Sequence, residues 1–227
     1  MFEPYSVIIP AWNASDFIVD AVSSVILQEL PPAQLIVVDD GSTDDTSDKV
    51  MAHFPSVQIV KQANGGPGSA CNVGLSHAQF DIIAFLDADD VWLPRKMSVQ
   101  LDAINGAGPE AVCFGQIRQF HTEKGDDGHG KVRDGLIRST IVTTRAAVDR
   151  VGSMLEPETK IGEMIEWLAR FREHGIPFVG VNDVVALRRI RAGSLTARTK
   201  REVGQDYIRL ARQHMLRKKG LTDDSAE

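Results

Sequence analysis

Aspartate side chains gather at two places, each directly after an apolar run. Residues 39–40 follow the run at 35–38, and residues 87–90 follow the run at 82–86. A single aspartate after a strand commonly forms a turn or caps a helix. The three carboxylates within 87–90 repel one another unless a cation neutralises them. Because oxygen ligands suit Mg2+ or Mn2+, which in turn hold phosphate groups, we expect a divalent cation bound together with a phosphate-bearing ligand.

These clusters need a scaffold that brings them together. Residues 1–100 alternate strand and helix patterns, which favours an α/β fold with a mostly parallel central sheet and flanking helices. We expect strands at 6–10, 35–38, 57–60 and 81–86, and helices at 15–28, 42–54, 65–78 and from Pro94 onward. Ser42 with Asp45 predicts a capping box at the second helix. Since ligands bind at the carboxyl ends of parallel strands, the polar ends 10–13, 39–42 and 87–90 should converge on one edge.

The second half of the chain is less regular. We expect strands at 111–120, 137–144 and 178–187, and a helix at 159–173. The polar loop 123–130 contains Asp126, Asp127 and His129, which are metal-ligand types, but its glycines favour a surface loop. We predict a single domain over residues 1–199, followed by a basic helix and an acidic tail over 200–227.

Composition limits the class of protein. The chain has 227 residues, of which 43% are hydrophobic and 25% charged, as in an ordinary globular protein. Its longest apolar runs fall short of the roughly 20 residues that span a bilayer. The N-terminal residues also lack the pattern of a secretory signal, so we expect a cytoplasmic protein. Its two cysteines, Cys71 and Cys113, should then be reduced.

Basic residues concentrate in an arm near the C-terminus. Eleven Lys or Arg and two acids lie between Arg188 and Lys219, whereas the whole chain carries a net charge of −6. An acidic body with a basic arm suggests that something anionic meets the arm. The candidates are a diphosphate, a lipid phosphate or membrane surface contacted peripherally, and an acidic partner; the alternative is a solvated helix face. We expect no nucleic acid partner.

Other nucleotide-binding and catalytic motifs do not fit the sequence. The nearest match to Gly-x-Gly-x-x-Gly, at residues 66–71, ends in Cys71 and follows a loop rather than a strand. The sequence contains no Gly-Lys-Ser/Thr phosphate loop. We also identify no Ser/His/Asp or Cys/His nucleophile set.

Four motifs, in order, resemble family 2 glycosyltransferases. They are VIIPAWN at 7–13, IVVDDGSTD at 36–44, NGGPGSACNVG at 64–74 and FLDADD at 85–90. The resemblance implies a GT-A fold, which is a Rossmann-like nucleotide-diphospho-sugar transferase fold. It also implies transfer of a sugar from a nucleotide-diphosphate donor, expected to be a UDP-sugar, to an acceptor hydroxyl with inversion and with Mn2+ or Mg2+. Residues 1–100 would form the donor half and 101–199 the acceptor half.

The resemblance assigns roles to single residues. Asp39 would bind the nucleotide base, Asp87 would lie near the ribose, and Asp89 would coordinate the metal. The expected nucleotide-sugar-binding residues are Pro10, Ala11, Trp12, Asn13, Asp39, Asn64, Gly68, Asn72, Asp87, Ala88, Asp89 and Arg191. The chain departs from the family at Cys71, where an arginine is usual, so its grip on the donor would differ there.

Family members carry a helix with a Glu-Asp pair that supplies the catalytic base, and residues 162–167 of the helix expected at 159–173 match that position. The usual aspartate is Met164 in this chain. At about 100° per residue the helix has two faces, one with Ile161, Met164, Ile165 and Leu168, and the other with Glu163, Glu166, Trp167 and Arg170. We therefore expect Met164 in the core and Glu163, or else Glu166, as the base. The alternative is that both glutamates are solvated surface acids, with Arg170 paired to Glu166. For Trp167 we expect packing against neighbouring elements rather than stacking on a sugar ring.

Two other functions stay open. Sugar-1-phosphate nucleotidyltransferases also use an α/β nucleotide site, but they carry a glycine-rich basic loop after the first strand, unlike residues 10–15. A non-catalytic sugar-nucleotide-binding protein would tolerate Cys71 and Met164. The acceptor is open as well, since a peptide, a protein, a small metabolite and a lipid-linked sugar all fit.

Overall fold

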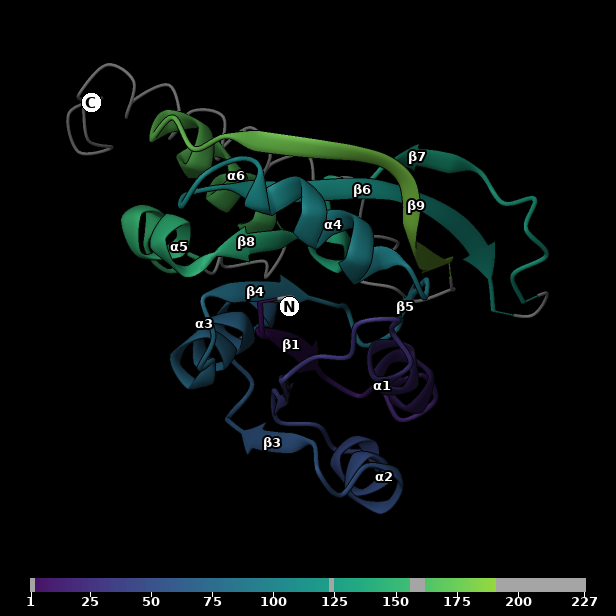
Figure 1. Cartoon of the computed structure of the whole chain (residues 1–227). Helices are drawn as coiled ribbons and strands as arrows, with labels where there is room; N and C mark the ends of the chain where they lie inside the picture. Colours follow the sequence, from purple (N-terminus) through teal and green to yellow (C-terminus); the bar gives the residue numbers. More distant parts are fainter. Residues whose placement is uncertain (1–2, 123–124, 156–161, 191–227) are drawn as a thin grey trace, which may run out of the picture.

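The computed structural model describes residues 3–122, 125–155 and 162–190. The strands are β1 (Tyr5–Ala11), β2 (Gln34–Asp39), β3 (Gln58–Lys61), β4 (Ile82–Phe85), β5 (Val91–Trp92), β6 (Val112–His121), β7 (Val132–Asp134), β8 (Val142–Thr144) and β9 (Phe178–Ile190). The helices are α1 (Ile18–Ile26), α2 (Thr46–His53), α3 (Pro67–His77), α4 (Lys96–Asn105), α5 (Arg145–Val151), α6 (Glu163–Glu173) and a short 3-10 helix, η1 (Arg138–Thr140). In this part of the chain the strands form a nine-stranded sheet with helices on both faces (Figure 1).

The sheet is mixed, and its first half is parallel. Its order is β3-β2-β1-β4-β8-β6-β9-β5, with β7 paired to β6. The pairs among β1, β2, β3 and β4 are parallel, whereas β8 runs antiparallel to β4 and β6. Strands β6 and β9 are parallel again. The expected α/β fold is therefore confirmed, and its parallel part carries the predicted strand ends.

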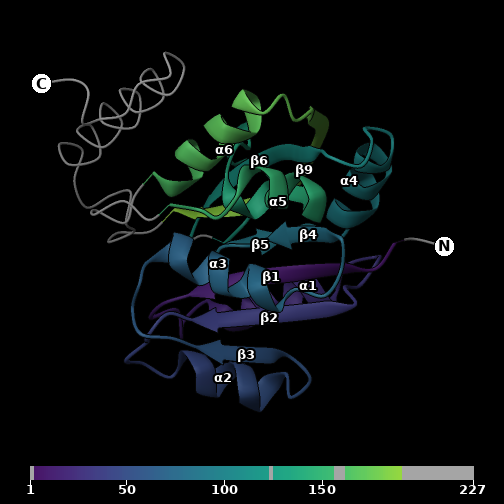
Figure 2. The same ribbon diagram turned by 90° about the vertical axis from the view of Figure 1, so that its left-hand side faces the viewer.

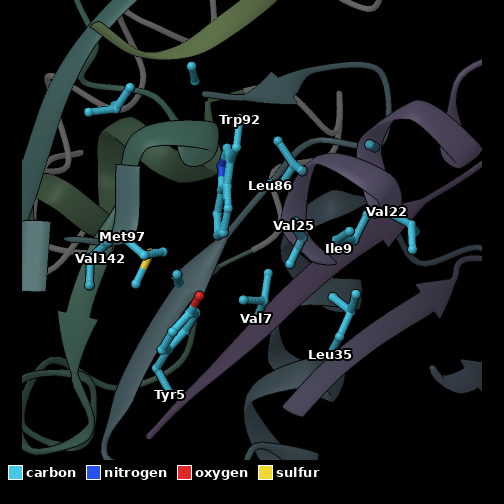
Figure 3. Close-up of a cluster of buried hydrophobic side chains, with 14 of the residues drawn as sticks. Tyr5, Val7, Ile9, Val22, Val25, Leu35, Leu86, Trp92, Met97 and Val142 are labelled. Carbon is cyan, nitrogen blue, oxygen red and sulfur yellow. The ribbon is translucent and has the colours of Figure 1, made fainter. Parts of the chain in front are cut away.

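Alternate side chains of the central strands enter two hydrophobic clusters, one on each face of the sheet. Val7 and Ile9 of β1 join the cluster under α1 and α4, while Ile8 joins the cluster under α3, α5 and α6. Figure 2 shows α3, α5 and α6 in front of the sheet. Figure 3 shows the other cluster, which includes Tyr5 and Trp92. Burial on both faces explains why these strands are uninterrupted apolar runs in the sequence.

The structure corrects several local predictions. The capping box of Ser42 and Asp45 is wrong, because α2 begins at Thr46 and Ser42 Oγ instead accepts the N–H of Asn13 at 3.0 Å. Ser42 therefore connects two loops instead of capping α2. Residues 137–144 form η1 followed by β8 rather than one strand. The two-residue strand β5 is not predicted, since so short a segment shows no periodic pattern.

Some predictions fall outside the described residues. These are Arg191, the basic arm beyond it, the acidic tail and the start of the helix expected at 159–173. Cys71 and Cys113 are both described, and both are buried cysteines that form no disulfide. Across the ranges given above, no helix has the length and apolar character needed to cross a membrane.

Candidate active site

The carboxyl ends of β1, β2 and β4 meet at one edge of the sheet, as the sequence predicts. Strand β1 lies between the other two, with Ala11 opposite Asp39. Pro10 and Ala11 are buried at the end of β1, whereas Trp12 directly after them is 43% exposed. The edge therefore presents an accessible aromatic ring beside the polar ends of two strands.

Asn13 ties the loops that follow β1 and β2 to each other. Its backbone is left-handed, with φ of 47°. Its N–H donates to Ser42 Oγ at 3.0 Å, and its Oδ1 accepts the N–H of Thr43 at 2.8 Å. Asn13 therefore fixes the position of the loop that follows Asp39.

Asp39 is a buried and ionised acid at the end of β2. Its Oδ1 accepts the N–H of Ser42 at 2.8 Å, and its Oδ2 accepts the hydroxyl of Ser47. Burial opposes ionisation, but these hydrogen bonds outweigh it and hold the pKa of Asp39 below its ordinary value. A fixed carboxylate of this kind suits recognition of a nucleobase N–H, the role expected for it.

Asp40 holds the glycine-rich loop that precedes α3, a role that the sequence pattern does not reveal. Its Oδ1 accepts the N–H of Gly65 at 2.7 Å, and its Oδ2 accepts the N–H of Gly66 at 2.9 Å. Its backbone oxygen accepts the Asn64 side-chain amide at 2.9 Å. The loop that leads to Gly68, which is buried in the first turn of α3, is therefore anchored on the residue that directly follows β2.

Asn72 is committed to the backbone of a distant segment. Its Nδ2 donates to the carbonyl of Met154 at 2.8 Å, and its Oδ1 accepts the Met154 N–H at 2.9 Å. The residue expected to shape the donor pocket thus joins α3 to the segment after α5. Its influence on a ligand would pass through that segment.

The loop 87–90 contains one structural acid and two that solvent reaches. Asp90 is 3% exposed, whereas Asp87 and Asp89 are partly exposed and Ala88 between them is buried. The Ser139 hydroxyl donates to Asp90 Oδ2 at 2.6 Å, and the Arg189 N–H donates to Oδ1 at 2.9 Å. Burial and the charges of Asp87 and Asp89 raise the pKa of Asp90 to about 8.

The donor set at this loop fits a divalent cation that arrives with a diphosphate. Within the described ranges, no three His, Cys, Asp or Glu side chains cluster as a closed metal site. Mg2+ commonly takes one or two carboxylates, keeps several waters and binds substrate phosphates. Asp89, the expected ligand, is a partly exposed carboxylate of the required kind, so the donor chemistry of this loop is compatible with Mg2+ or Mn2+.

Arg138 of η1 connects the acidic loop to α6. Its side chain is buried, with Nη1 donating to Asp87 Oδ1 and Nη2 donating to Glu163 Oε1. Burial disfavours the charge, but the carboxylates, Asp87 above all, outweigh this and raise the pKa of Arg138 above its ordinary value. The sequence contains no sign of this contact, because Arg138 lies in a segment that resembles a strand.

The two predicted faces of α6 are only partly right. Leu168 of the predicted apolar face is in the core and Met164 packs against it, but Glu163, Glu166 and Trp167 of the opposite face are buried too. Ile165 is 43% exposed and Met164 only partly buried, whereas Trp167 is fully buried. The two glutamates are buried as well, so the alternative of solvated acids is wrong. Burial of these acids is possible because Arg138 pairs with Glu163 and Arg170 pairs with Glu166 at 2.9 Å. The second pair is the one contact that the alternative of solvated acids includes correctly.

Trp167 is buried and packs against neighbouring aromatic rings, as expected. Its ring makes edge-on contacts with Phe85 and Phe171. Its indole N–H donates to the carbonyl of Gly152 at 2.9 Å. Two large rings, Trp167 and Phe171, thus bury more apolar surface than Met164 and Ile165 would, which explains the orientation of α6.

Arg189 reaches the acidic loop from β9. Its Nε donates to the carbonyl of Asp89 at 2.9 Å, and its guanidinium lies over the rings of Phe17 and Phe120 at 4.9 and 4.7 Å. The sequence drew attention to this arginine cluster but favoured Arg191, which lies outside the described residues.

Relatives of the chain are glycosyltransferases. The profile of Glycosyl transferase family 2 matches residues 6–154. The putative teichuronic acid biosynthesis glycosyltransferase TuaG of Bacillus subtilis (strain 168) is 28% identical over 206 residues, which cover 85% of this chain and 81% of TuaG. The uncharacterized glycosyltransferase alr2836 of Nostoc sp. is 40% identical over 96 residues, which cover 40% of this chain. The matched part spans 30% of alr2836 and 16% of each of two Rickettsia relatives.

The fold is shared with a solved structure. S. aureus TarS 1–349 in complex with UDP-GlcNAc superimposes with a TM-score of 0.72 at 20% identity, covering 94% of this chain and 66% of that one. This likeness confirms the GT-A fold. The family profile matches residues 6–154, which is more than half of the chain and includes the ends of β1, β2 and β4. The chain therefore belongs to glycosyl transferase family 2.

Proposed function

We propose that this chain transfers a sugar from a UDP-sugar to an acceptor hydroxyl with inversion at the anomeric carbon. The observation that carries the proposal is the sheet edge where the ends of β1, β2 and β4 meet α6 through Arg138. The family of the chain supports the reaction class. The solved complexes of S. aureus TarS with UDP-GlcNAc and UDP support a UDP-sugar as donor.

The donor would lie across the three strand ends. Trp12 and Asp39 would meet the uracil, Asp87 the ribose, and Asp89 the Mn2+ or Mg2+ on the diphosphate. A bound metal ion of this kind supplies positive charge that stabilises the departing diphosphate. The partial exposure of Asp87 and Asp89, beside the buried Asp90, supports this division of roles.

Glu163 is the better placed of the two candidate bases. It shares Arg138 with Asp87 at the donor edge, whereas Glu166 is 2% exposed and is held by Arg170. In the proposed step, the Glu163 carboxylate takes the acceptor hydroxyl proton as that oxygen bonds to the anomeric carbon. The bond from this carbon to the UDP oxygen breaks, and UDP leaves with the electron pair.

A non-catalytic sugar-nucleotide-binding protein is the second candidate. The observation that favours it is the burial of both glutamates in ion pairs, with Met164 at the position where the family has its aspartate. Such a protein would bind UDP-sugars and release no UDP from them.

Thermal unfolding with UDP, GDP and dTDP, each with and without Mn2+, tests the donor assignment. At 100 times its dissociation constant, a ligand of the native state adds about 2.7 kcal/mol of stability. We expect a clear rise in Tm with UDP and Mn2+ together and a much smaller rise with UDP alone. Equal Tm values with every nucleotide would contradict the donor assignment.

A further inference from the structure

One buried guanidinium connects the two halves of the site. Arg138 donates from Nη1 to Asp87 and from Nη2 to Glu163. The Asp87 side chain is 30% exposed, whereas those of Arg138 and Glu163 are 9% and 8% exposed. A ligand can therefore reach Asp87 directly, and Arg138 is the contact through which Asp87 is joined to the more buried glutamate.

The position of Arg138 is fixed by its neighbours in η1. The Ser139 hydroxyl donates to Asp90 at 2.6 Å, and the Thr140 carbonyl accepts the Gln100 side-chain amide at 2.9 Å. The three-residue helix η1 thus contacts the loop 87–90 twice, through Ser139 at Asp90 and through Arg138 at Asp87. A surface arginine with a mobile side chain would not have this support.

The two carboxylates set the orientation of the guanidinium. Its Nε is buried and has no hydrogen-bond partner among the described residues. An unsatisfied N–H is unfavourable, so the paired contacts with Asp87 and Glu163 must outweigh it. Because a guanidinium is planar and presents its donors as a rigid fork, it also fixes the two carboxylates relative to each other.

We propose that Arg138 is a positioning residue that couples the donor side of the site to Glu163. The proposal rests on the proposed function, since it gives Asp87 the donor and Glu163 the acceptor proton. Arg138 acts through these two carboxylates. Loss of the fork releases both, so a single substitution should impair donor binding and turnover together.

Steady-state kinetics of UDP release from a UDP-sugar separate this role from general charge or packing. We expect Asp87→Asn mainly to raise KM for the donor and Glu163→Gln mainly to lower kcat. Arg138→Lys keeps the charge but not the fork, and we expect it to do both, with KM at least fivefold higher and kcat at least tenfold lower. Adding Asp87→Asn to Arg138→Lys should then raise KM by less than threefold. Near-normal KM and kcat in Arg138→Lys would overturn the proposal.

Arg145→Lys is the matched control. Arg145 is a half-buried arginine whose Nη2 donates to the carbonyls of Ala78 and Phe80, before β4 rather than after it. We expect this variant to lose stability while its KM and kcat stay within twofold of the wild type. Equal kinetic losses in the two arginine variants would show that destabilisation alone explains the effect.

Hydrogen exchange of the ligand-free chain tests the positioning without relying on the proposed function. In Arg138→Lys we expect amides in the first turn of α6 and in the loop 87–90 to exchange at least tenfold faster. In Arg145→Lys both segments should exchange as in the wild type. Unchanged exchange in Arg138→Lys would overturn the coupling, whereas wild-type chain that neither binds UDP nor releases it would contradict only the proposed function.

Discussion

Lys96 carries a charge into the core of the protein, and its replacement by methionine gives a sharp prediction about stability. Its side chain is fully buried at the start of α4. Its Nζ donates to Gln100 Oε1 and, at 3.3 Å, to the carbonyl of Thr140, and it lies 4.5 Å from the centre of the Trp92 ring. Burial lowers the pKa of Lys96 from 10.5 to about 7.

The size of the effect follows from that shift. At about 1.4 kcal/mol per pKa unit, burying the charge costs about 5 kcal/mol below pH 7. Because a pKa shift is a net difference between the charged and neutral forms, this cost already includes the contacts of the charge with Trp92 and the two oxygens. Lys96→Met removes the charge, but it leaves Gln100 Oε1 without this donor, which costs about 1–2 kcal/mol. We therefore expect the variant to be about 3–4 kcal/mol more stable than the wild type at pH 6.

The sign of the pH dependence is fixed by the lowered pKa. Between pH 7 and 10.5 the unfolded chain binds one more proton at Lys96 than the folded chain, so wild-type stability rises with pH. Between pH 7 and pH 9 this effect raises the free energy of unfolding of the wild type by about 3 kcal/mol. The advantage of Lys96→Met should thus shrink between pH 6 and 9, to about 1 kcal/mol or less at pH 9.

Urea unfolding at pH 6, 7, 8 and 9 measures this difference directly. Only the difference between variant and wild type is used, so the titration of other groups cancels. Lys131→Met, at an exposed lysine, controls for the loss of a positive charge. If Lys96→Met differs from the wild type by the same free energy at all four pH values, the reasoning is refuted.

Three further predictions concern single contacts. Gly74→Ala should lower the free energy of unfolding by about 1–2 kcal/mol, because its Cβ would lie 2.3 Å from Ile8 Cγ2, and urea unfolding measures this loss. Asn72→Ala should cost about 1–3 kcal/mol by leaving the Met154 backbone groups without their partners; an unchanged urea midpoint would contradict this. Asp89→Asn should weaken UDP binding at least tenfold with Mn2+ and hardly at all without it, as measured by calorimetry, and equal losses in both conditions would argue against a metal ligand.

The sheet edge could be predicted because its signals are local. Uninterrupted apolar runs mark strands buried on both faces, and polar residues at their ends mark the edge where ligands bind. The order of β1, β2 and β4 brings these ends together as expected. The loops are less predictable, because Ser42 has equally good local and long-range partners and the structure uses Asn13.

The acceptor side could not be predicted from periodicity. A helical pattern identifies two faces of α6, but it does not say which one is buried when a face with two glutamates also carries Trp167. The answer depends on Arg138, which comes from η1, 25 residues away in the chain. Such a pairing between distant segments has no signature in the sequence of either one.

UDP release from UDP-sugars at saturating donor, with Mn2+, tests the central claim most directly. Water serves as the acceptor, so the acceptor of the protein need not be known. We predict steady release by the wild type and at least a hundredfold slower release by Glu163→Gln, with Glu166→Gln within threefold of the wild type. Release by Glu163→Gln at the wild-type rate would contradict Glu163 as the base, and a wild type that binds UDP-sugars without releasing UDP would identify a binding protein instead.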